Sequence, residues 1–212
     1  MLIQILCDNI HSWIIPYAKE LRNQIISLGH DVYLLHDHQD VREGDILVML
    51  SCERIFKNLH LNKNNLVVHE SALPQGKGWS PMTWQVIEGK GIIPVTLFEA
   101  TSKVDDGCVY GQETMELDGL ELVDELREKQ GTVTLKLVVS FIKKYPDVVG
   151  KPQYGEESFY PRRRPEDSRL NIDKSIKEQF NLLRVSDNER YPAWFEINGV
   201  KYILKIYKET TL

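Results

Sequence analysis

Strand-length apolar runs that alternate with helical patterns constrain the fold of this chain more than any other feature of its sequence. Four such runs are largely apolar along their whole length: residues 2–7, 32–35, 45–50 and 65–69. Between the first two runs, apolar side chains recur at helical spacing from Trp13 to Leu28. Strands that are apolar on both faces are typical of parallel sheets covered by helices. The sequence therefore predicts an α/β chain with a Rossmann-like, mostly parallel sheet and helices on both faces.

The rest of the sequence extends this alternation and then changes character near residue 150. The expected elements are helices within residues 53–59 and 80–89, strands at 93–98 and 109–113, and a long helix pair within 117–145. A stretch rich in proline, glycine and charge then indicates a linker. Asn198-Gly199 separates two alternating runs, which is the strongest short signal for a β-hairpin. We therefore expect one domain over residues 1–150, followed over residues 151–212 by a linker and a small C-terminal subdomain with a β-hairpin.

Composition and charge argue against several classes of function. The chain has 26 Lys and Arg against 31 Asp and Glu, and its net charge of −5 disfavours binding to nucleic acid through phosphates. No apolar run reaches the ~18 residues of a membrane span, and the first residues lack the basic lead of a signal peptide. We therefore expect a cytoplasmic protein without a membrane partner. We also expect structural thiols and no metal site, because no metal-ligand or disulfide spacing relates the three cysteines, Cys7, Cys52 and Cys108.

Two stretches of the sequence carry residues suited to catalysis. Open parallel sheets bind ligands beyond the carboxyl ends of their strands, so a pocket is expected after Leu50 and around His69. No glycine-rich dinucleotide motif or P-loop occurs in the chain. His69 ends the fourth apolar run and begins the segment HESALPQGKGWSP, and the later turn Asp105-Asp106-Gly107 precedes another strand. Alone, each stretch is also explained by ordinary structure, as a histidine at a strand end and a solvated acidic turn.

Together the two stretches resemble the folate-dependent formyltransferase family, whose hallmark reads N-x-H-x-S-L-L-P-x-x-x-G-x-x-P before a helix, a G-x-T strand and a D-x-G turn. The matching positions follow in the same order: His69, Ser71, Leu73, Pro74, Gly78, Pro81, Gly89, Thr96, Asp105 and Gly107. The resemblance implies transfer of a formyl group from N10-formyltetrahydrofolate to an amine by an Asn–His–Asp constellation. We expect His69 and Asp105 to be catalytic and Asp106 to face solvent. Cofactor contacts are expected from Ser51, Cys52, Leu73, Pro74 and Val104.

The asparagine of that constellation is missing, because Val67 stands two residues before His69. Residues two apart on a strand share a face, so Val67 occupies the position from which a carboxamide would point at the formyl oxygen. Asn65 is next on that face, but it lies ~13 Å from His69 along a regular strand. Three outcomes stay open. His69 with a water or a backbone amide stabilises the oxyanion, or Asn9 or another distant donor does so, or catalysis is lost.

The C-terminal part indicates which amine is formylated. Residues 160–167, YPRRRPED, and residues 191–195, YPAWF, resemble the tail of the nucleotide-sugar N-formyltransferases. As chemistry, the arginine triplet is either a solvated basic patch or a contact for a diphosphate. The chain is similar to the small N-formyltransferases of pseudaminic acid and related surface-sugar pathways, which implies UDP-linked 4-amino-4,6-dideoxy-N-acetylaltrosamine as acceptor. Substrate contacts are expected from Ser71, Lys77, Gly78, Trp79, Arg163 and Tyr191.

Other functions and an oligomer are also compatible with parts of the sequence. A glycinamide ribonucleotide-type formyltransferase has about this length but lacks the PRRRPED segment and the hairpin, and an inactive folate or sugar-nucleotide binding module would explain Val67. A methionyl-tRNA formyltransferase is disfavoured, because the chain leaves no room for a basic C-terminal barrel and is acidic. Tyr202, Leu204 and Ile206 predict an apolar strand face, which suits either a homodimer through the C-terminal element or the cover of its own domain.

Overall fold

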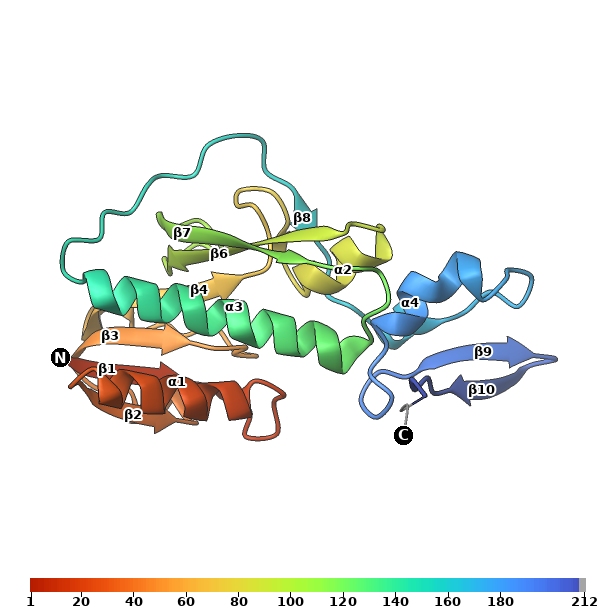
Figure 1. Cartoon of the computed structure of the whole chain (residues 1–212), viewed down its shortest axis with the longest axis horizontal. Helices are drawn as coiled ribbons and strands as arrows, with labels where there is room; N and C mark the ends of the chain where they lie inside the picture. The colour runs from red at the N-terminus through yellow and green to blue at the C-terminus, as the bar shows by residue number, and fades with distance from the viewer. Residues whose placement is uncertain (210–212) are drawn as a thin grey trace.

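The computed structural model of the protein describes residues 1–209 and is built around a six-stranded sheet (Figure 1). Its strand order is β2-β1-β3-β4-β6-β7. The strands are β1 Leu2–Leu6, β2 Asp31–Leu35, β3 Gly44–Met49, β4 Asn62–His69, β6 Ile92–Glu99 and β7 Val109–Glu116. The first four are parallel, and β6 runs antiparallel to both of its neighbours, β4 and β7. The predicted α/β class and mostly parallel sheet are confirmed.

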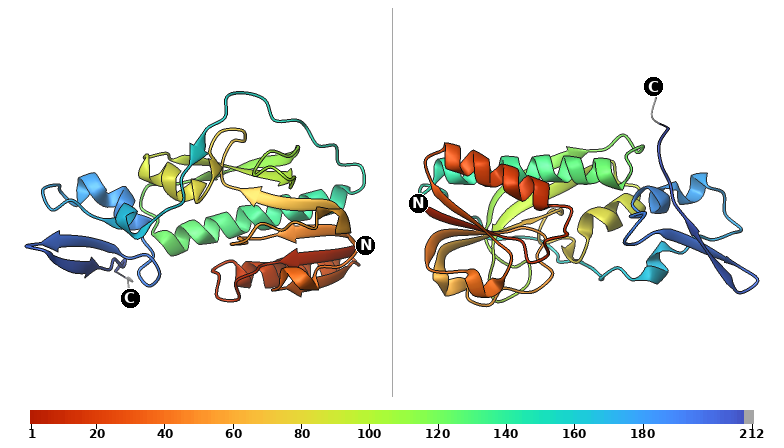
Figure 2. Two further views of the ribbon diagram at one scale, coloured as in Figure 1. Left: turned by 180° about the vertical axis from the view of Figure 1, so that it is seen from behind. Right: turned by 90° about the horizontal axis from the view of Figure 1, so that it is seen from below.

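Two α-helices, α1 Ile15–Ser27 and α3 Val123–Lys144, cover one face of this sheet and lie side by side (Figure 2). On α1, Ala18, Leu21 and Ile25 recur at helical spacing and are buried in the main core. Gly131 of α3 lies against the ring of Tyr17, where a β-carbon would come within 2.4 Å of the ring atoms. The close packing of the two helices therefore requires a glycine at this position.

Short turns and loops, in place of the expected α-helices, cover the opposite face of the sheet. The 3₁₀ turns η1 His38–Asp40 and η2 Leu59–Leu61 and the loop between β3 and η2 lie there. They enclose a second core of five buried side chains: Leu6, Val41, Leu47, Met49 and Phe56. The helix expected within residues 53–59 is not formed. The Asp8 carboxylate instead accepts the backbone N–H groups of Glu53 and Arg54 and holds these residues in an irregular loop.

The elements around α3 also differ from the expectation. The expected helix pair within residues 117–145 is the single helix α3, because residues 117–122 form a turn. The Glu121 carboxylate accepts the backbone N–H groups of Asp118 and Gly119, which fixes this turn. The helix expected within residues 80–89 is formed as α2 Pro81–Ile87.

A connecting segment, residues 146–158, which we call the strap, leaves the end of α3 and arcs back toward the loop after β4 (Figure 1). Lys151 of the strap exchanges two backbone hydrogen bonds with Val109 at the start of β7. The strap leads into β8 Phe159–Tyr160, which pairs in parallel with β5 Lys77–Gly78. The chain that enters the C-terminal part is thus anchored on the loop that follows His69.

The C-terminal part contains the predicted hairpin. Its elements are η3 Pro165–Ser168, η4 Lys177–Gln179, α4 Phe180–Arg184, β9 Ala193–Ile197 and β10 Val200–Leu204. Asn198 and Gly199 have φ values of +50° and +79° between the paired strands. Two consecutive residues with positive φ are typical of a type I′ turn, whose twist matches that of the strands.

The apolar face of the hairpin is partly covered by its own subdomain. Leu204 and Ile206 pack against a small core that contains Leu170, Leu183 and Ala193. The ring of Tyr202 stacks on Phe195 with centroids 5.4 Å apart and is 46% exposed. Two of the three residues named from the sequence, Leu204 and Ile206, therefore cover the core of their own subdomain. A homodimer stays a prediction.

Between residues 1 and 209, no helix combines the length and the apolar character that crossing a membrane requires. The longest, α3, carries charged side chains along its length. The cytoplasmic location stays a prediction.

Candidate functional site

His69 is the last residue of β4, and its imidazole is buried at the carboxyl edge of the parallel strands. Its Nε2 lies 2.8 Å from the carbonyl oxygen of Gly76 and 3.8 Å from Oδ2 of Asp105. Because a carbonyl oxygen only accepts hydrogen bonds, Nε2 carries the proton of the neutral ring. Within the described residues 1–209, no protein group is hydrogen-bonded to Nδ1. Nδ1 is therefore the ring nitrogen that is free to meet a reacting group.

Asp105 lies opposite His69, in the turn before β7. The backbone N–H of Gly78 donates to its Oδ2 at 2.9 Å, and the side chains of His69 and Asp105 are only 9% and 10% exposed. Asp105 itself has a φ of +53°, which aspartate tolerates better than most residues. At Gly107, a β-carbon would come within 1.7 Å of the Glu99 carbonyl oxygen. The D-x-G spacing therefore has a steric cause, since no larger residue fits at its third position.

The loop between His69 and α2 is shaped by a buried serine and two glycines. Ser71 is 2% exposed, and its backbone oxygen accepts the hydroxyl of Thr96 at 2.6 Å. A β-carbon on Gly76 would lie 2.9 Å from Cβ of Ser71, and one on Gly78 would lie 2.4 Å from the Tyr160 carbonyl oxygen. Ser71, expected to contact substrate, thus lies within the loop that holds His69.

Lys77, also expected to contact substrate, is buried in an ion triad. Its side chain is 2% exposed, and Nζ lies 2.7 Å from Oε1 of Glu157 and 3.0 Å from Oδ1 of Asp106. Burial lowers the pKa of Lys77, but the hydrogen bonds to these carboxylates outweigh it and leave the pKa above its ordinary value. Asp106, expected to face solvent, is partly exposed and is nevertheless bound to Lys77, which lowers its pKa. The ammonium group of Lys77 is therefore bound by two carboxylates of the segments that surround the site.

Val67 and the two asparagines weighed as its substitutes are all engaged in packing or in loop contacts. Val67 packs against the second core on the face opposite α1 and α3. The Asn65 amide donates to the Leu59 carbonyl oxygen at 2.9 Å, and the Asn9 amide donates to Glu53 at 2.7 Å. Neither asparagine is hydrogen-bonded to His69 or Asp105. A carboxamide in the family position would have to displace packed apolar side chains.

Substituting Val67→Asn is therefore expected to give no increase in kcat and to lower the free energy of unfolding by about 1 kcal/mol, the low end of the penalty for an unpaired amide, because Val67 is only partly buried. The assay would be formyl transfer under saturating substrates, together with urea unfolding of the same preparation. Val67→Leu is the apolar control for packing alone. A higher kcat with an unchanged unfolding midpoint would show instead that the oxyanion lacks a donor in the native protein.

The five residues expected to contact the cofactor fall in three loops. Leu73 and Pro74 are buried in the loop after His69, and Val104, 56% exposed, directly precedes Asp105. Ser51 and Cys52 lie in the loop after β3, the strand next to β4. Leu73, Pro74 and Val104 thus belong to the two loops next to His69 and Asp105, and apolar side chains in these loops suit the ring system of a folate.

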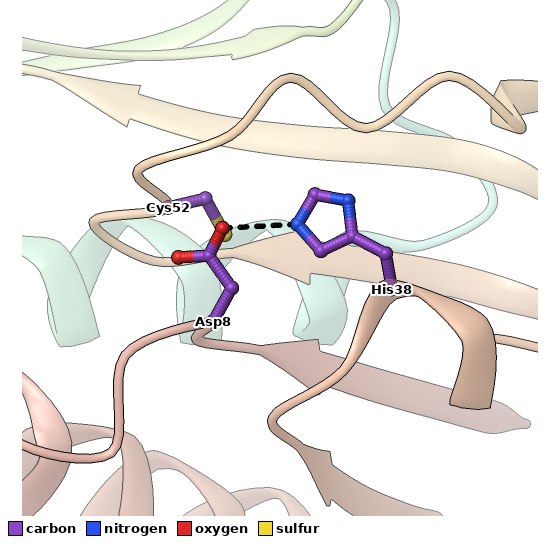
Figure 3. Close-up of side chains that lie close together, drawn as sticks. All are labelled: Asp8, His38 and Cys52. Carbon is purple, nitrogen blue, oxygen red and sulfur yellow. Dashed lines mark hydrogen bonds and ion pairs between the residues drawn. The ribbon is translucent and has the colours of Figure 1, made fainter.

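A cluster that the sequence did not indicate lies at the same sheet edge and contains Asp8, His38 and Cys52 (Figure 3). The side-chain atoms with which these three residues could bind a metal ion all lie within 4.8 Å of one another. Burial raises the pKa of the Cys52 thiol to about 12, so the sulfur is protonated and its Sγ–H donates to the Leu6 carbonyl oxygen. Asp8 Oδ2 already binds His38 Nε2 at 3.0 Å and the Arg54 backbone and guanidinium. These contacts fix the loops beyond β1, β2 and β3.

Glu70 is a second functional candidate that sequence reasoning missed. Its carboxyl group accepts a hydrogen bond from the amide of Gln130 on α3, and its carbonyl oxygen accepts one from Gln85 on α2. Burial raises the pKa of this carboxyl group. Glu70 therefore ties the residue next to His69 to two helices. Its place in the H-x-S motif is an unspecified position, so no sequence signal marked it.

The remaining residues expected to contact the acceptor substrate lie in the chain after β8 or against it. The Arg162 guanidinium lies over the Trp79 ring, 4.7 Å from its centroid. Arg163 is half-buried, donates to the Asp167 carbonyl oxygen and the Ser168 hydroxyl, and has a buried Nε without a partner in the described chain. Burial lowers the pKa of Arg163, and Tyr191 is 49% exposed. Arg163 is thus anchored inside the subdomain, whereas Arg162 and Arg164 are exposed, and both alternatives for the triplet stay open.

Comparisons with known proteins find relatives both in sequence and in fold. No family model matches the chain. A methionyl-tRNA formyltransferase of Thermodesulfovibrio yellowstonii is 29% identical over 119 residues, which cover 55% of this chain and 39% of that protein. The chain is similar to formyltransferases. It spans less than half the length of this relative.

Solved structures show the same fold. A methionyl-tRNA formyltransferase from Clostridium thermocellum superposes with a TM-score of 0.84 at 17% identity and covers 99% of this chain and 94% of its own. A sugar N-formyltransferase from a Shewanella species gives a TM-score of 0.71 at 17% identity over 100% of this chain and 99% of its own. HypX from Aquifex aeolicus, solved with tetrahydrofolic acid, gives 0.79 at 18% identity over 96% of this chain and 37% of its own. The formyltransferase fold is therefore shared along nearly the whole chain.

Proposed function

We propose that the protein is an N-formyltransferase that moves a formyl group from N10-formyltetrahydrofolate to the amine of a nucleotide-linked amino sugar. The observation that carries the proposal is the buried pair of His69 and Asp105, 3.8 Å apart at the carboxyl edge of the sheet. The similarity to formyltransferases in sequence and fold supports the same reaction. The apolar Leu73, Pro74 and Val104 in the loops that carry the pair support a folate as donor.

The two residues divide the proton and charge movements of this reaction between them. N10-formyltetrahydrofolate supplies the electrophilic formyl carbon, whose oxygen becomes negative as the amine attacks. His69 acts in its imidazolium form, which the Asp105 carboxylate stabilises and which carries a second proton on Nδ1. It donates a hydrogen bond to that oxygen from Nδ1, because Nε2 is held by Gly76 and Asp105. Asp105 receives the proton that the amine loses, directly or through water. When the tetrahedral intermediate collapses, the bond between the formyl carbon and N10 breaks and this proton passes to N10, so tetrahydrofolate leaves. The burial of both side chains strengthens these interactions by excluding solvent.

The choice of a nucleotide-sugar acceptor is supported by the C-terminal part of the chain. Arg162 over Trp79 and the half-buried Arg163, whose Nε has no partner in the described chain, offer guanidinium groups suited to a diphosphate. Both lie in the YPRRRPED segment, whose resemblance favours UDP-linked 4-amino-4,6-dideoxy-N-acetylaltrosamine and the pseudaminic acid pathway. We also propose that residues 1–150 form the catalytic domain and residues 151–212 a linker and acceptor-binding subdomain.

A steady-state assay with N10-formyltetrahydrofolate and a panel of acceptors tests the proposal. The panel would contain UDP- and dTDP-linked amino sugars, glycinamide ribonucleotide and methionyl-tRNA. Turnover with one nucleotide-amino sugar and none of the other acceptors is the expected result. Turnover with methionyl-tRNA or glycinamide ribonucleotide would replace the proposed acceptor. Folate binding without turnover of any acceptor would identify the chain as a binding module, the alternative that Val67 suggests.

The arginine contacts give a prediction of their own. Arg162→Ala is expected to raise the KM for the amino sugar about tenfold and to leave the KM for N10-formyltetrahydrofolate nearly unchanged, because a charge-assisted contact to phosphate contributes about 1.5–3 kcal/mol. Arg164→Ala is the matched control, since Arg164 is exposed and none of the described contacts involves its guanidinium. Wild-type kinetics in the Arg162 variant would show that Arg162 belongs to a solvated basic patch and does not bind the sugar nucleotide.

A further inference from the structure

The strap crosses both loops that carry the proposed catalytic pair. It leaves α3 at one end of the sheet and returns to pair through β8 with the loop after His69 (Figure 1). Between these anchors, the side chains of Gln153 and Ser158 reach from the strap to the two loops. Neither residue touches the imidazole or the carboxylate itself. Any effect on the pair must therefore act through the backbone that each one holds.

Gln153 holds the turn that presents Asp105. Its Nε2 donates to the Asp105 carbonyl oxygen at 3.0 Å and to the Gly107 carbonyl oxygen at 2.9 Å. These two acceptors flank the turn whose first residue has a φ of +53°, a conformation that needs support from its surroundings. The Oε1 of Gln153 is buried with no partner in the described chain. The side-chain amide of Gln153 is thus held only through its NH2 group, which faces the turn that carries Asp105.

Ser158 holds the carbonyl group that binds His69. Its Oγ accepts the backbone N–H of Gly76 at 2.8 Å, and its own carbonyl oxygen accepts the N–H of Lys77 at 2.9 Å. The peptide groups on both sides of Gly76 are therefore fixed by one residue. The Gly76 carbonyl oxygen then accepts the Nε2 proton of His69 at 2.8 Å. The rotation of the imidazole depends on this carbonyl group.

We propose that Gln153 and Ser158 are positioning residues for the formyl-transfer pair, and that the strap sets the relative orientation of His69 and Asp105. This inference rests on the proposed function, because it assigns the two residues to that reaction. The ion pair of Glu157 with Lys77, which also binds Asp106, adds a third attachment between the same segments. The same strap continues into Tyr160 and the arginine triplet. The segment that orients the pair thereby also fixes the start of the acceptor-binding subdomain.

Misplacement of a catalytic group by about 1 Å can lower a rate ~10²-fold, because the reacting geometry is lost. Gln153→Ala and Ser158→Ala are therefore each expected to lower kcat by about 10- to 100-fold, with changes in both KM values of less than about threefold. Gln153→Glu places a carboxylate against two carbonyl groups and should lower kcat at least as much. Ser158→Thr keeps the hydroxyl and should restore most of the activity. Glu156→Ala, an exposed change on the same strap, is the control.

Two nuclear magnetic resonance signals report the positioning without formyl transfer. The Gly78 amide donates to Asp105 Oδ2, so its resonance should shift in Gln153→Ala. The Nε2 proton of His69 is held by Gly76, so it should exchange with water faster in Ser158→Ala than in wild type. His69→Gln assigns the latter signal among the six histidines of the chain. Thermal unfolding of every variant separates a local change from loss of the fold.

Unchanged signals in both alanine variants would overturn the proposal, whatever their activity. Altered signals with unchanged kcat would show that the strap holds the loops but that its geometry does not limit the reaction, which also overturns it. A wild-type chain that formylates no acceptor would instead refute the proposed function. In that case the two signals still decide whether the strap orients His69 and Asp105, so the two failures are distinguishable. Loss of kcat together with altered signals, and recovery of both in Ser158→Thr, is the result we expect.

Discussion

Substituting His69→Ala or Asp105→Asn is expected to lower kcat/KM for formyl transfer at least ~10²-fold, because each removes an interaction that is strongest in the transition state. The histidine variant loses the donor to the developing oxyanion. The aspartate variant keeps an oxygen that can accept the Gly78 N–H at 2.9 Å, but it loses the charge that stabilises the imidazolium. The measurement is steady-state kinetics with the best acceptor of the panel, beside thermal unfolding of each variant.

The neighbouring acid provides a matched control for this experiment. Asp106→Asn makes the same chemical change one residue away, in a side chain that faces Lys77 and solvent instead of His69. Its effect on kcat/KM should stay below about tenfold, because Glu157 still pairs with Lys77. If Asp106→Asn were the severe variant and Asp105→Asn the mild one, the assignment of the D-x-G register would be wrong.

The sequence predicted those parts of the fold that depend on local patterns. The apolar runs placed β1 to β4 correctly. β1 and β3 are buried along most of their length, and strands buried on both faces leave few polar positions. Asn198-Gly199 placed the hairpin, because few dipeptides suit two positive φ values. The H-x-S and D-x-G spacings placed His69 and Asp105 in facing loops, because the turn admits only glycine at position 107. In each case a local steric requirement is visible in the residue type.

Features that depend on long-range contacts were not predictable in this way. The helix expected within residues 53–59 gave way to a loop because Asp8, far away in sequence, binds its amides. The burial of Lys77 depends on Glu157, which lies in a segment that reads as a linker. Gln153 and Ser158 belong to the same segment and carry no motif of their own. A proline- and glycine-rich stretch thus contains the residues that hold the site together, and only its path through space shows this.

The largest effect on stability is expected from a buried ion pair that joins the C-terminal part to α3. Glu121 Oε2 lies 3.3 Å from Nη1 of Arg184 on α4, and both side chains are less than 5% exposed. Lys129 binds the other carboxylate oxygen at 3.0 Å. Burial raises the pKa of Glu121, but the hydrogen bonds from the Asp118 backbone and Lys129 outweigh it and lower the pKa to about 2. The folded protein therefore stabilises the ionised form of this carboxyl group.

Glu121→Gln is accordingly expected to lower the free energy of unfolding by about 3 kcal/mol at pH 7, since it leaves the Arg184 guanidinium buried without a counter-charge. The ordinary pKa of the carboxyl group is 4.5. A pKa that is depressed on folding contributes its full stabilisation above the unfolded value and loses it as the pH falls toward the folded value. The difference in the free energy of unfolding between wild type and Glu121→Gln should thus be constant above about pH 5.5 and shrink steadily below pH 4.5.

Urea unfolding at pH 7 and at several values down to pH 3.5 measures this difference directly. Glu128→Gln, the same change at an exposed position of α3, controls for the altered net charge and should stay within about 0.5 kcal/mol of wild type. A difference for Glu121→Gln that did not vary with pH would mean that packing, and not charge, holds α4 against the start of α3.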